Sequence, residues 1–285
     1  PNRPDLTARP VRLASKPSTQ TDLESDWVAY WCKRLEVPVV FHRKLWELAY
    51  VLQAIWEHGH MAPGKRGLGF GCGREPLPSL LAGEGVAVTM TDLAPEASAG
   101  LGWTDTNQHT DDVDVAFHGH LVDRATFDAN VALRWVDMNA IPKDLRDFDF
   151  CWSICALEHL GSIAKGLDFI ENSLQTLRPG GLAVHTTEFN FFDDEHTIDN
   201  WPTVLFQQRH FEDIAARLRA DGHRVAPLDF DVGCKPLDRF IDLPPWEHDM
   251  TDYQRGVWGG DSNHIKLSID GFATTCFGLV IAKAG

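Results

Sequence analysis

The sequence predicts an α/β fold, in which helices cover both faces of a mostly parallel sheet. Three observations support this prediction. From Lys65 onward, strand-like apolar segments alternate with helical segments. A glycine cluster follows the first strand-like segment, and acidic residues end other strand-like segments. Such alternation places parallel strands side by side, joined by helical crossovers. The expected strands are 66–70, 86–92, 131–137, 148–154 and 182–188. The expected helices are 76–83, 163–177 and 208–221.

The chain divides by pattern into three parts. Residues 1–21 are expected to form a flexible lead-in, and 22–62 an N-terminal helical cap of two helices broken near Pro38. Thr21 and Glu24 have the spacing of a capping box. Residues 63–285 form the main domain.

This main domain carries two insertions, 94–130 and 234–263. The β-rich segments 224–230 and 272–282 are expected to pair at one edge of the sheet.

Composition excludes several classes of function. The net charge of −15, with no basic run of four residues, argues against a nucleic-acid partner. The negative electrostatic potential of such a chain favours a neutral or cationic small molecule as ligand. No run of 18 apolar residues is present, so we expect no membrane span. The six cysteines form no Cys-x-x-Cys pair, which favours reduced thiols and a cytoplasmic location.

A glycine turn indicates where a ligand binds. The segment GLGFGCGREPLPSLLA (67–82) places Gly71 and Gly73 directly after an apolar strand, where the missing Cβ atoms let a ligand approach the backbone. The next strand ends in Asp92, 21 residues after Gly71, in a position to accept hydrogen bonds from ribose hydroxyls. This part alone fits several nucleotide-like ligands.

The segment 148–190 narrows the choice. FDFCWSICALEHLGSIAKGLDFIENSLQTLRPGGLAVHTTEFN contains a strand, a helix, a tight RPGG turn and a second strand. It resembles the class I S-adenosylmethionine-dependent methyltransferases, and the resemblance covers residues 64–285. A nicotinamide-dependent enzyme would leave this segment unexplained. The resemblance implies a Rossmann-like, seven-stranded sheet whose last strand runs antiparallel, with S-adenosylmethionine as cofactor.

The same resemblance implies the cofactor-binding residues. Asp92 is expected to hold the ribose diol, Asp137 the adenine amino group, with Met138 beside the ring. Ser153 and Ile154 are expected to border the methyl-bearing sulfonium. The full set is Gly71, Cys72, Gly73, Glu75, Asp92, Leu93, Asp137, Met138, Ser153 and Ile154.

The glycine turn departs from the family pattern at two positions. Many members read acidic-x-Gly-x-Gly-x-Gly, whereas this chain has Gly69 at the acidic position and Glu75 at the last glycine. Gly71 and Gly73 are still expected to flank the methionine part of the cofactor, with the Cys72 backbone between them. Glu75 either supplies the missing charge for the cofactor's ammonium group or favours the N-terminus of the helix that begins at Pro76.

Methylation of a hydroxyl needs a base, which contributes roughly 10²–10⁴-fold to the rate. The candidates follow the fourth and fifth predicted strands: Glu158, His159 and Glu188. For the first two the alternative is a capping or hydrogen-bonding role, and for Glu188 it is binding of loop amides.

We therefore predict O-methylation of a hydroxyl on a sugar, glycan or small polar metabolite. N-methylation of a small molecule and a non-catalytic S-adenosylmethionine-binding subunit are the alternatives. The oligomeric state is left open.

No metal site is assigned. The run from Asp193 to His196 has oxygen and imidazole ligands that suit a divalent ion, but adjacent acidic residues in a loop usually face solvent. His118 and His120 lack a third ligand at a recognisable spacing.

Four tryptophans at helical positions are expected to pack: Trp27, Trp31, Trp46 and Trp56. Four in predicted loops either contact the acceptor or fix the loops: Trp103, Trp201, Trp246 and Trp258.

Overall fold

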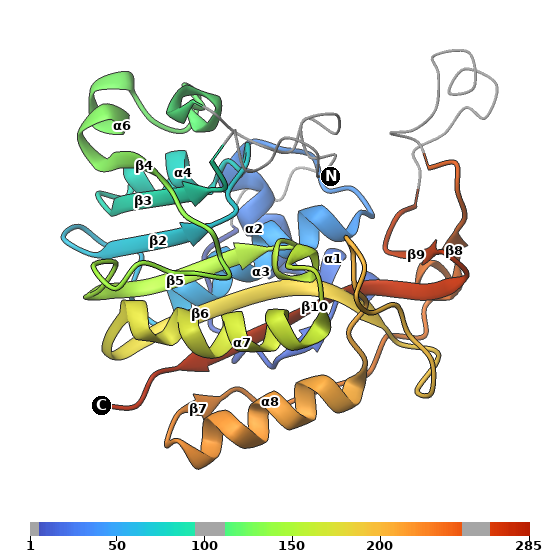
Figure 1. The fold of residues 1–285 in the computed structure, drawn as a ribbon. Coiled ribbons are helices and arrows are strands. Elements are labelled where there is room, and N and C mark those ends of the chain that lie inside the picture. The colour runs from blue at the N-terminus through green and yellow to red at the C-terminus, as the bar shows by residue number, and fades with distance from the viewer. Residues whose placement is uncertain (1–5, 95–111, 247–262) are drawn as a thin grey trace.

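The computed structural model describes residues 6–94, 112–246 and 263–285, and its centre is a twisted sheet (Figure 1). Five parallel strands lie in the order β4-β3-β2-β5-β6. They are β2 (Arg66–Phe70), β3 (Ala87–Asp92), β4 (Val131–Trp135), β5 (Phe148–Ile154) and β6 (Leu177–Asn190). Each predicted strand is therefore confirmed. The RPGG segment lies inside β6 as an irregularity, since Leu177 pairs with Phe148 and Leu182 with Phe150.

The sheet continues beyond β6 with antiparallel β10 (Phe272–Ala282), as the resemblance implies. Next come β9 (Lys266–Ile269) and β8 (Ile241–Asp242), and the short β1 (Lys16–Pro17) and β7 (Arg224–Val225) also pair with β10. Within the described residues the sheet thus has ten strands, around the core of the seven-stranded sheet that the resemblance implies. The predicted pairing of 224–230 with 272–282 holds for β7, but the expected edge position is wrong, because β10 lies between β6 and β9.

Helices cover both faces of the sheet, as predicted (Figure 1). In the view of Figure 1, α7 and α8 lie in front of the sheet and α2 and α3 behind it. The helices are α1 (Gln20–Leu23), α2 (Asp26–Leu35), α3 (Arg43–Glu57), α4 (Leu77–Gly83), α6 (Arg124–Asn130), α7 (Ile163–Ser173) and α8 (Gln208–Ala220). Short 3₁₀ turns are η1 (Val113–Ala116), η2 (Leu157–His159), η3 (Leu174–Thr176) and η4 (Pro236–Arg239). Among the described helices, none has the length and apolarity to cross a bilayer.

The N-terminal helices form a layer of the domain core. Tyr50 of α3 packs so closely on β10 that a Cβ at Gly278 would lie 2.3 Å from its ring. The break near Pro38 is confirmed, but the predicted capping box is wrong: Thr19 caps α1 and Ser25 caps α2, while Thr21 lies within α1. Part of the segment predicted as a lead-in, residues 16–17, pairs with β10 as β1.

Strand alternation decides which side chains reach each face. Along β5, Phe150, Trp152 and Ile154 pack in the cluster that contains α2, α3 and α4. Cys151 packs on the other face, in the cluster with α7 and α8. From Phe150 onward, side chains of β5 at even positions therefore face α3, whereas Phe148, before the irregularity, packs on the other face. This alternation determines which of the predicted β5 residues can reach the cavity.

Candidate functional site

A cavity of about 480 Å³ lies at the carboxyl ends of the parallel strands. Its walls come from the loops that follow β2, β3, β4 and β5, and from α3. Nine of the ten residues predicted for the cofactor line it: Gly71, Cys72, Gly73, Glu75, Asp92, Leu93, Asp137, Met138 and Ile154. The structure thus brings these residues together, while their individual contacts to a cofactor stay predictions.

The glycine turn has the backbone shape that a closely approaching ligand requires. Gly71 and Gly73 have φ angles of +60° and +50°, in the left-handed region that favours glycine. A Cβ at Gly71 would lie 2.8 Å from the Cβ of Ala156, across the cavity wall. Any side chain at this position would therefore collide with Ala156, another residue of the cavity wall.

Two carboxylates are held at fixed orientations on the cavity wall. Asp92 Oδ2 accepts a hydrogen bond from the Gly73 amide at 3.1 Å, and its Oδ1 accepts one from the Leu93 amide at 2.8 Å. Asp137 lies just beyond β4, and its Oδ1 accepts from the Asn139 amide at 2.8 Å. Two acceptors beside a glycine turn fit the ribose and adenine groups of the expected cofactor.

Ser153 is the one residue of the predicted cofactor set that does not line the cavity, and its expected place beside the sulfonium stays a prediction. Ser153 has the same parity as Cys151, so it faces α7 and not the cavity. Its hydroxyl lies 2.8 Å from His185 Nδ1, and the Ser173 hydroxyl lies 3.1 Å from Nε2 of the same ring. The Ser153 side chain therefore belongs to a buried polar contact under α7.

Glu75 lies in the wall beside the glycine turn. Its Oε2 accepts a hydrogen bond from Trp152 Nε1 at 3.1 Å. The helix α4 begins at Leu77 with Pro76 as its cap residue, so Glu75 precedes the first turn. Burial raises the pKa of Glu75 to about 8.

His159 is the predicted catalytic residue that lines the cavity. Its Nδ1 lies 3.0 Å from the Pro202 carbonyl and 3.2 Å from the Thr203 hydroxyl. Burial lowers its pKa to about 4, although the Pro202 carbonyl opposes the shift. At neutral pH the ring is neutral, and since Nδ1 donates its proton to the carbonyl, the lone pair is on Nε2.

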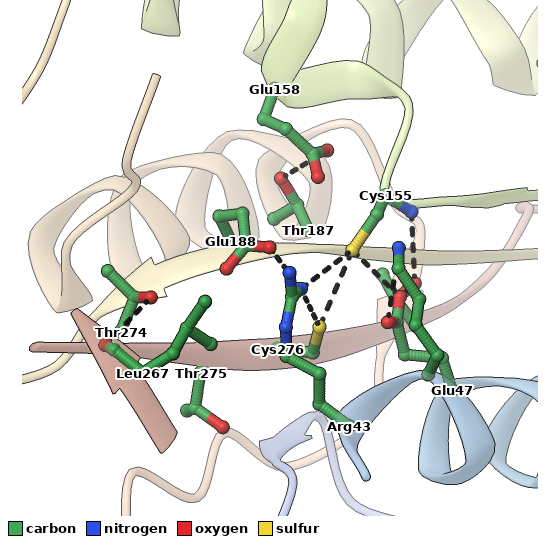
Figure 2. Close-up of polar contacts among 12 residues, drawn as sticks. Arg43, Glu47, Cys155, Glu158, Thr187, Glu188, Leu267, Thr274, Thr275 and Cys276 are labelled. Atoms are coloured by element: carbon green, nitrogen blue, oxygen red, sulfur yellow. Dashed lines mark hydrogen bonds and ion pairs between the residues drawn. The ribbon is translucent and has the colours of Figure 1, made fainter. Parts of the chain in front are cut away.

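Glu158 and Glu188 lie behind the cavity wall and do not line it. Glu158 Oε2 accepts from the Thr187 hydroxyl at 3.0 Å, and burial raises its pKa to about 6. Glu188 forms an ion pair with Arg43, yet burial outweighs this cation and the pKa of Glu188 is raised (Figure 2). One oxygen of each carboxylate, Glu158 Oε1 and Glu188 Oε2, is buried without a hydrogen-bond partner.

Around that ion pair lies a buried polar cluster, which we define as Arg43, Glu47, Cys155, Glu188 and Cys276. Figure 2 shows the Arg43 guanidinium between the Glu188 carboxylate and the two sulfur atoms. Its Nη1 lies 3.2 Å from Cys276 Sγ, and Cys155 donates to Glu47 Oε2 at 2.9 Å. Burial opposes ionisation of Glu47, but the nearby cations of Lys44 and Arg43 lower its pKa overall.

The α3 contributions were not predicted from the sequence. Lys44 and Leu48, one helical turn apart, line the cavity. The Lys44 ammonium lies 3.5 Å from Glu47 Oε1, and 47% of this side chain is exposed. The sequence signal that could have indicated these residues is a charged residue one turn from a leucine, on a helix otherwise rich in buried residues.

The donor set gives no support to a metal centre. Among the described residues, two groups of three converge: Glu47 with both cysteines of the cluster, and Cys155 with Glu158 and Glu188. The Arg43 guanidinium already supplies a cation beside both groups.

The other candidate ligands have structural contacts instead. Asp193 Oδ1 accepts the amides of Glu195 and His196, each at 2.8 Å, so it stabilises a turn. The rings of His118 and His120 contact each other at 5.7 Å between centroids. In the part of the chain that the structure describes, neither histidine joins a group of three possible ligands.

The tryptophans separate into packed and exposed ones. Trp27, Trp31 and Trp46 are buried and Trp56 packs against the core, as predicted. Trp201 is 61% exposed and Trp246 contacts His264 edge-on. Trp103 and Trp258 lie outside the described residues. Neither described loop tryptophan lines the cavity.

Comparisons with known proteins agree with this geometry. A family model of a methyltransferase domain matches residues 47–222. No curated protein sequence gives a significant match.

Several solved structures are similar to this chain. The [4+2]-cyclase SpnF aligns over 95% of this chain and 98% of its own, with 15% identity and a TM-score of 0.50. A protein of Galdieria sulphuraria proposed to be a sarcosine dimethylglycine methyltransferase aligns over 91% and 99%, with 14% identity and a TM-score of 0.49. Phosphoethanolamine N-methyltransferase 2 of Haemonchus contortus aligns over 82% and 52%, with 17% identity and a TM-score of 0.47. At these identities the likeness extends to the fold alone.

Proposed function

Since the chain belongs to the methyltransferase family and S-adenosylmethionine is its cofactor, we propose that it methylates a hydroxyl group of a sugar or small polar molecule. When bound, the cofactor supplies an electrophilic methyl group on a sulfonium. The protein's contribution is to orient the acceptor, exclude water and remove the hydroxyl proton during attack.

His159 carries this proposal. It lines the cavity, its ring is neutral at neutral pH, and the Pro202 carbonyl fixes the tautomer that leaves a lone pair on Nε2. A neutral imidazole oriented by a hydrogen bond at Nδ1 is suited to accept a proton at Nε2. The residue thus has both the position and the protonation state of a general base.

Glu158 supports His159 from behind the wall. Its Oε1 lies 4.0 Å from His159 Nε2, and this oxygen is buried without a hydrogen-bond partner. A carboxylate at this distance stabilises the imidazolium that forms when Nε2 takes up a proton. Glu158 therefore acts as a positioning residue in the proposed reaction, and Glu188 is held away from the acceptor by Arg43.

The test is a transfer assay with methyl-labelled cofactor and a panel of hydroxyl and amine acceptors. For a hydroxyl acceptor, His159→Gln should lower kcat by roughly 10²–10⁴-fold, because the base is lost. Its affinity for S-adenosylhomocysteine, measured by calorimetry, should stay that of the wild type. His196→Gln is the matched control, since His196 is an exposed histidine on the following loop. An unchanged kcat in His159→Gln would refute the assigned base.

Methylation of an amine is the second candidate. The net charge of −15 favours a neutral or cationic acceptor, a class that includes amines. A neutral amine needs no base, so His159→Gln would then change kcat little while product still forms. The same assay separates the two acceptors.

A non-catalytic binding role is the remaining alternative. The likeness to a [4+2]-cyclase is a reason to measure methyl transfer directly. Cofactor binding without methylated product across the whole panel would favour this role.

A further inference from the structure

The place of the missing acidic residue is filled by an indole ring. Gly69 in β2 pairs with Trp152 in β5. A Cβ at Gly69 would lie 2.5 Å from Trp152 Cζ2 and 2.3 Å from Cys72 Sγ. An aspartate or glutamate at position 69 is therefore incompatible with the Trp152 ring in this position. The Trp152 ring in this position thus requires a glycine at position 69.

The same ring holds the carboxylate that the chain has gained. Trp152 Nε1 donates to Glu75 Oε2, and Glu75 lines the cavity beside Gly71 and Gly73. The two departures from the family pattern are thus physically connected: the ring that excludes a carboxylate at position 69 orients one at position 75.

The surroundings of Glu75 do not neutralise a negative charge. Among the described residues, Glu75 takes part in no ion pair. The charged groups that face it are Lys44 and Glu47 from α3 and Asp92 at the end of β3. Lys44 favours the ionised form, whereas Glu47, Asp92 and above all burial oppose it, and the pKa of Glu75 is raised to about 8. In the absence of a cationic ligand, the carboxyl group is mostly protonated at pH 7.

We propose that Glu75 binds the ammonium group of the cofactor's methionine part and that this binding releases the carboxyl proton of Glu75 to solvent. The step is balanced: a neutral carboxylic acid and a bound ammonium give a carboxylate–ammonium ion pair and one proton in solution. The proposal rests on S-adenosylmethionine being the cofactor and is independent of the acceptor. It makes cofactor affinity increase with pH up to the pKa of Glu75.

The experiment is calorimetric binding of S-adenosylhomocysteine at pH 7, in phosphate and in Tris, whose ionisation enthalpies differ. Wild-type protein should release about one proton per ligand bound. Binding of 5′-methylthioadenosine, which lacks the amino-acid part, should release none. Glu75→Gln should release none with either compound, and its affinity for S-adenosylhomocysteine should fall by roughly 30-fold or more. Glu195→Gln, on an exposed loop, should behave as the wild type.

The two ligands keep the test decisive if Glu75→Gln fails to fold, because the wild type alone compares an ammonium-bearing compound with one that lacks it. Equal proton release for both compounds, or undiminished release in Glu75→Gln, would overturn the proposal. Failure of the wild type to bind S-adenosylhomocysteine would overturn the cofactor assignment and this proposal together. Binding without methyl transfer would contradict the proposed function while leaving the role of Glu75 supported.

Discussion

The two ends of the site are built in different ways. At the cofactor end, backbone turns and carboxylates follow the ends of neighbouring strands, and Asp92 is held by amides of the adjoining loops. The proposed acceptor end is the part of the cavity beside His159, and the buried polar cluster lies behind its wall. There α3 packs charged side chains against the sheet, and Arg43 meets Glu188 across 145 positions of the chain. One end depends on backbone conformation, and the other on the mutual neutralisation of buried charges.

Because the two ends differ in this way, we expect mutations in them to have different effects. Removing one partner of a buried ion pair lowers the free energy of unfolding, because water cannot solvate the charge that remains. We therefore expect substitutions in the buried polar cluster to affect folding first and substitutions in the glycine turn to affect ligand binding first. The predictions below test that separation.

The largest effect is expected for Arg43→Met. Glu188 would lose its cation and would have to stay buried as an uncompensated charge or take up a proton, so the free energy of unfolding should fall by about 3–5 kcal/mol at pH 7.5. Denaturant unfolding measures this loss. Adding Glu188→Gln should restore part of the stability, because the uncompensated charge is then removed.

The control for Arg43→Met is Arg146→Met, since Arg146 is an arginine whose side chain is largely exposed. It should change the unfolding free energy by less than about 0.5 kcal/mol. A small effect of Arg43→Met, similar to this control, would show that the acceptor end does not depend on charge neutralisation.

A smaller effect of opposite sign is expected for Glu158→Gln. The folded pKa of Glu158, about 6, lies above its unfolded value of 4.5, so its ionisation destabilises the folded state as pH rises through this range. Relative to wild type, the variant should gain about 2 kcal/mol of unfolding free energy at pH 7.5 and less than about 0.5 kcal/mol at pH 4.5. Unfolding curves at both pH values measure the difference. A pH-independent difference would contradict the buried-charge explanation.

The cofactor end was largely predictable because its signals are local. A glycine turn and an acidic residue at a strand end lie next to the strands that position them, and parallel strands bring such ends to one edge. Ser153 shows the limit of this reasoning. All seven residues of β5 are buried, so the strand has no polar alternation that would indicate which face Ser153 occupies.

The acceptor end was not predictable for a related reason. A charged residue on an amphipathic helix is normally expected to face solvent, yet Glu47 is fully buried in α3. Besides Lys44 on the same helix, its hydrogen-bond partners follow β5 or lie in β6, more than 100 positions away. The sequence contains these residues but no local pattern that pairs them. Helix packing on the sheet decides the pairing.

The smallest effect on folding and the most specific effect on binding are expected for Gly71→Ala. The new Cβ would lie 2.8 Å from Ala156 and occupy the left-handed conformation, so the affinity for S-adenosylhomocysteine should fall at least about tenfold. Gly180→Ala is the matched control, because Gly180 has a φ angle of +74° but nothing within 4 Å of the added atom. Both variants share the backbone cost, and calorimetry should find weaker binding in Gly71→Ala alone. Equal affinities in the two would mean that the close approach of Gly71 to Ala156 is not needed for cofactor binding.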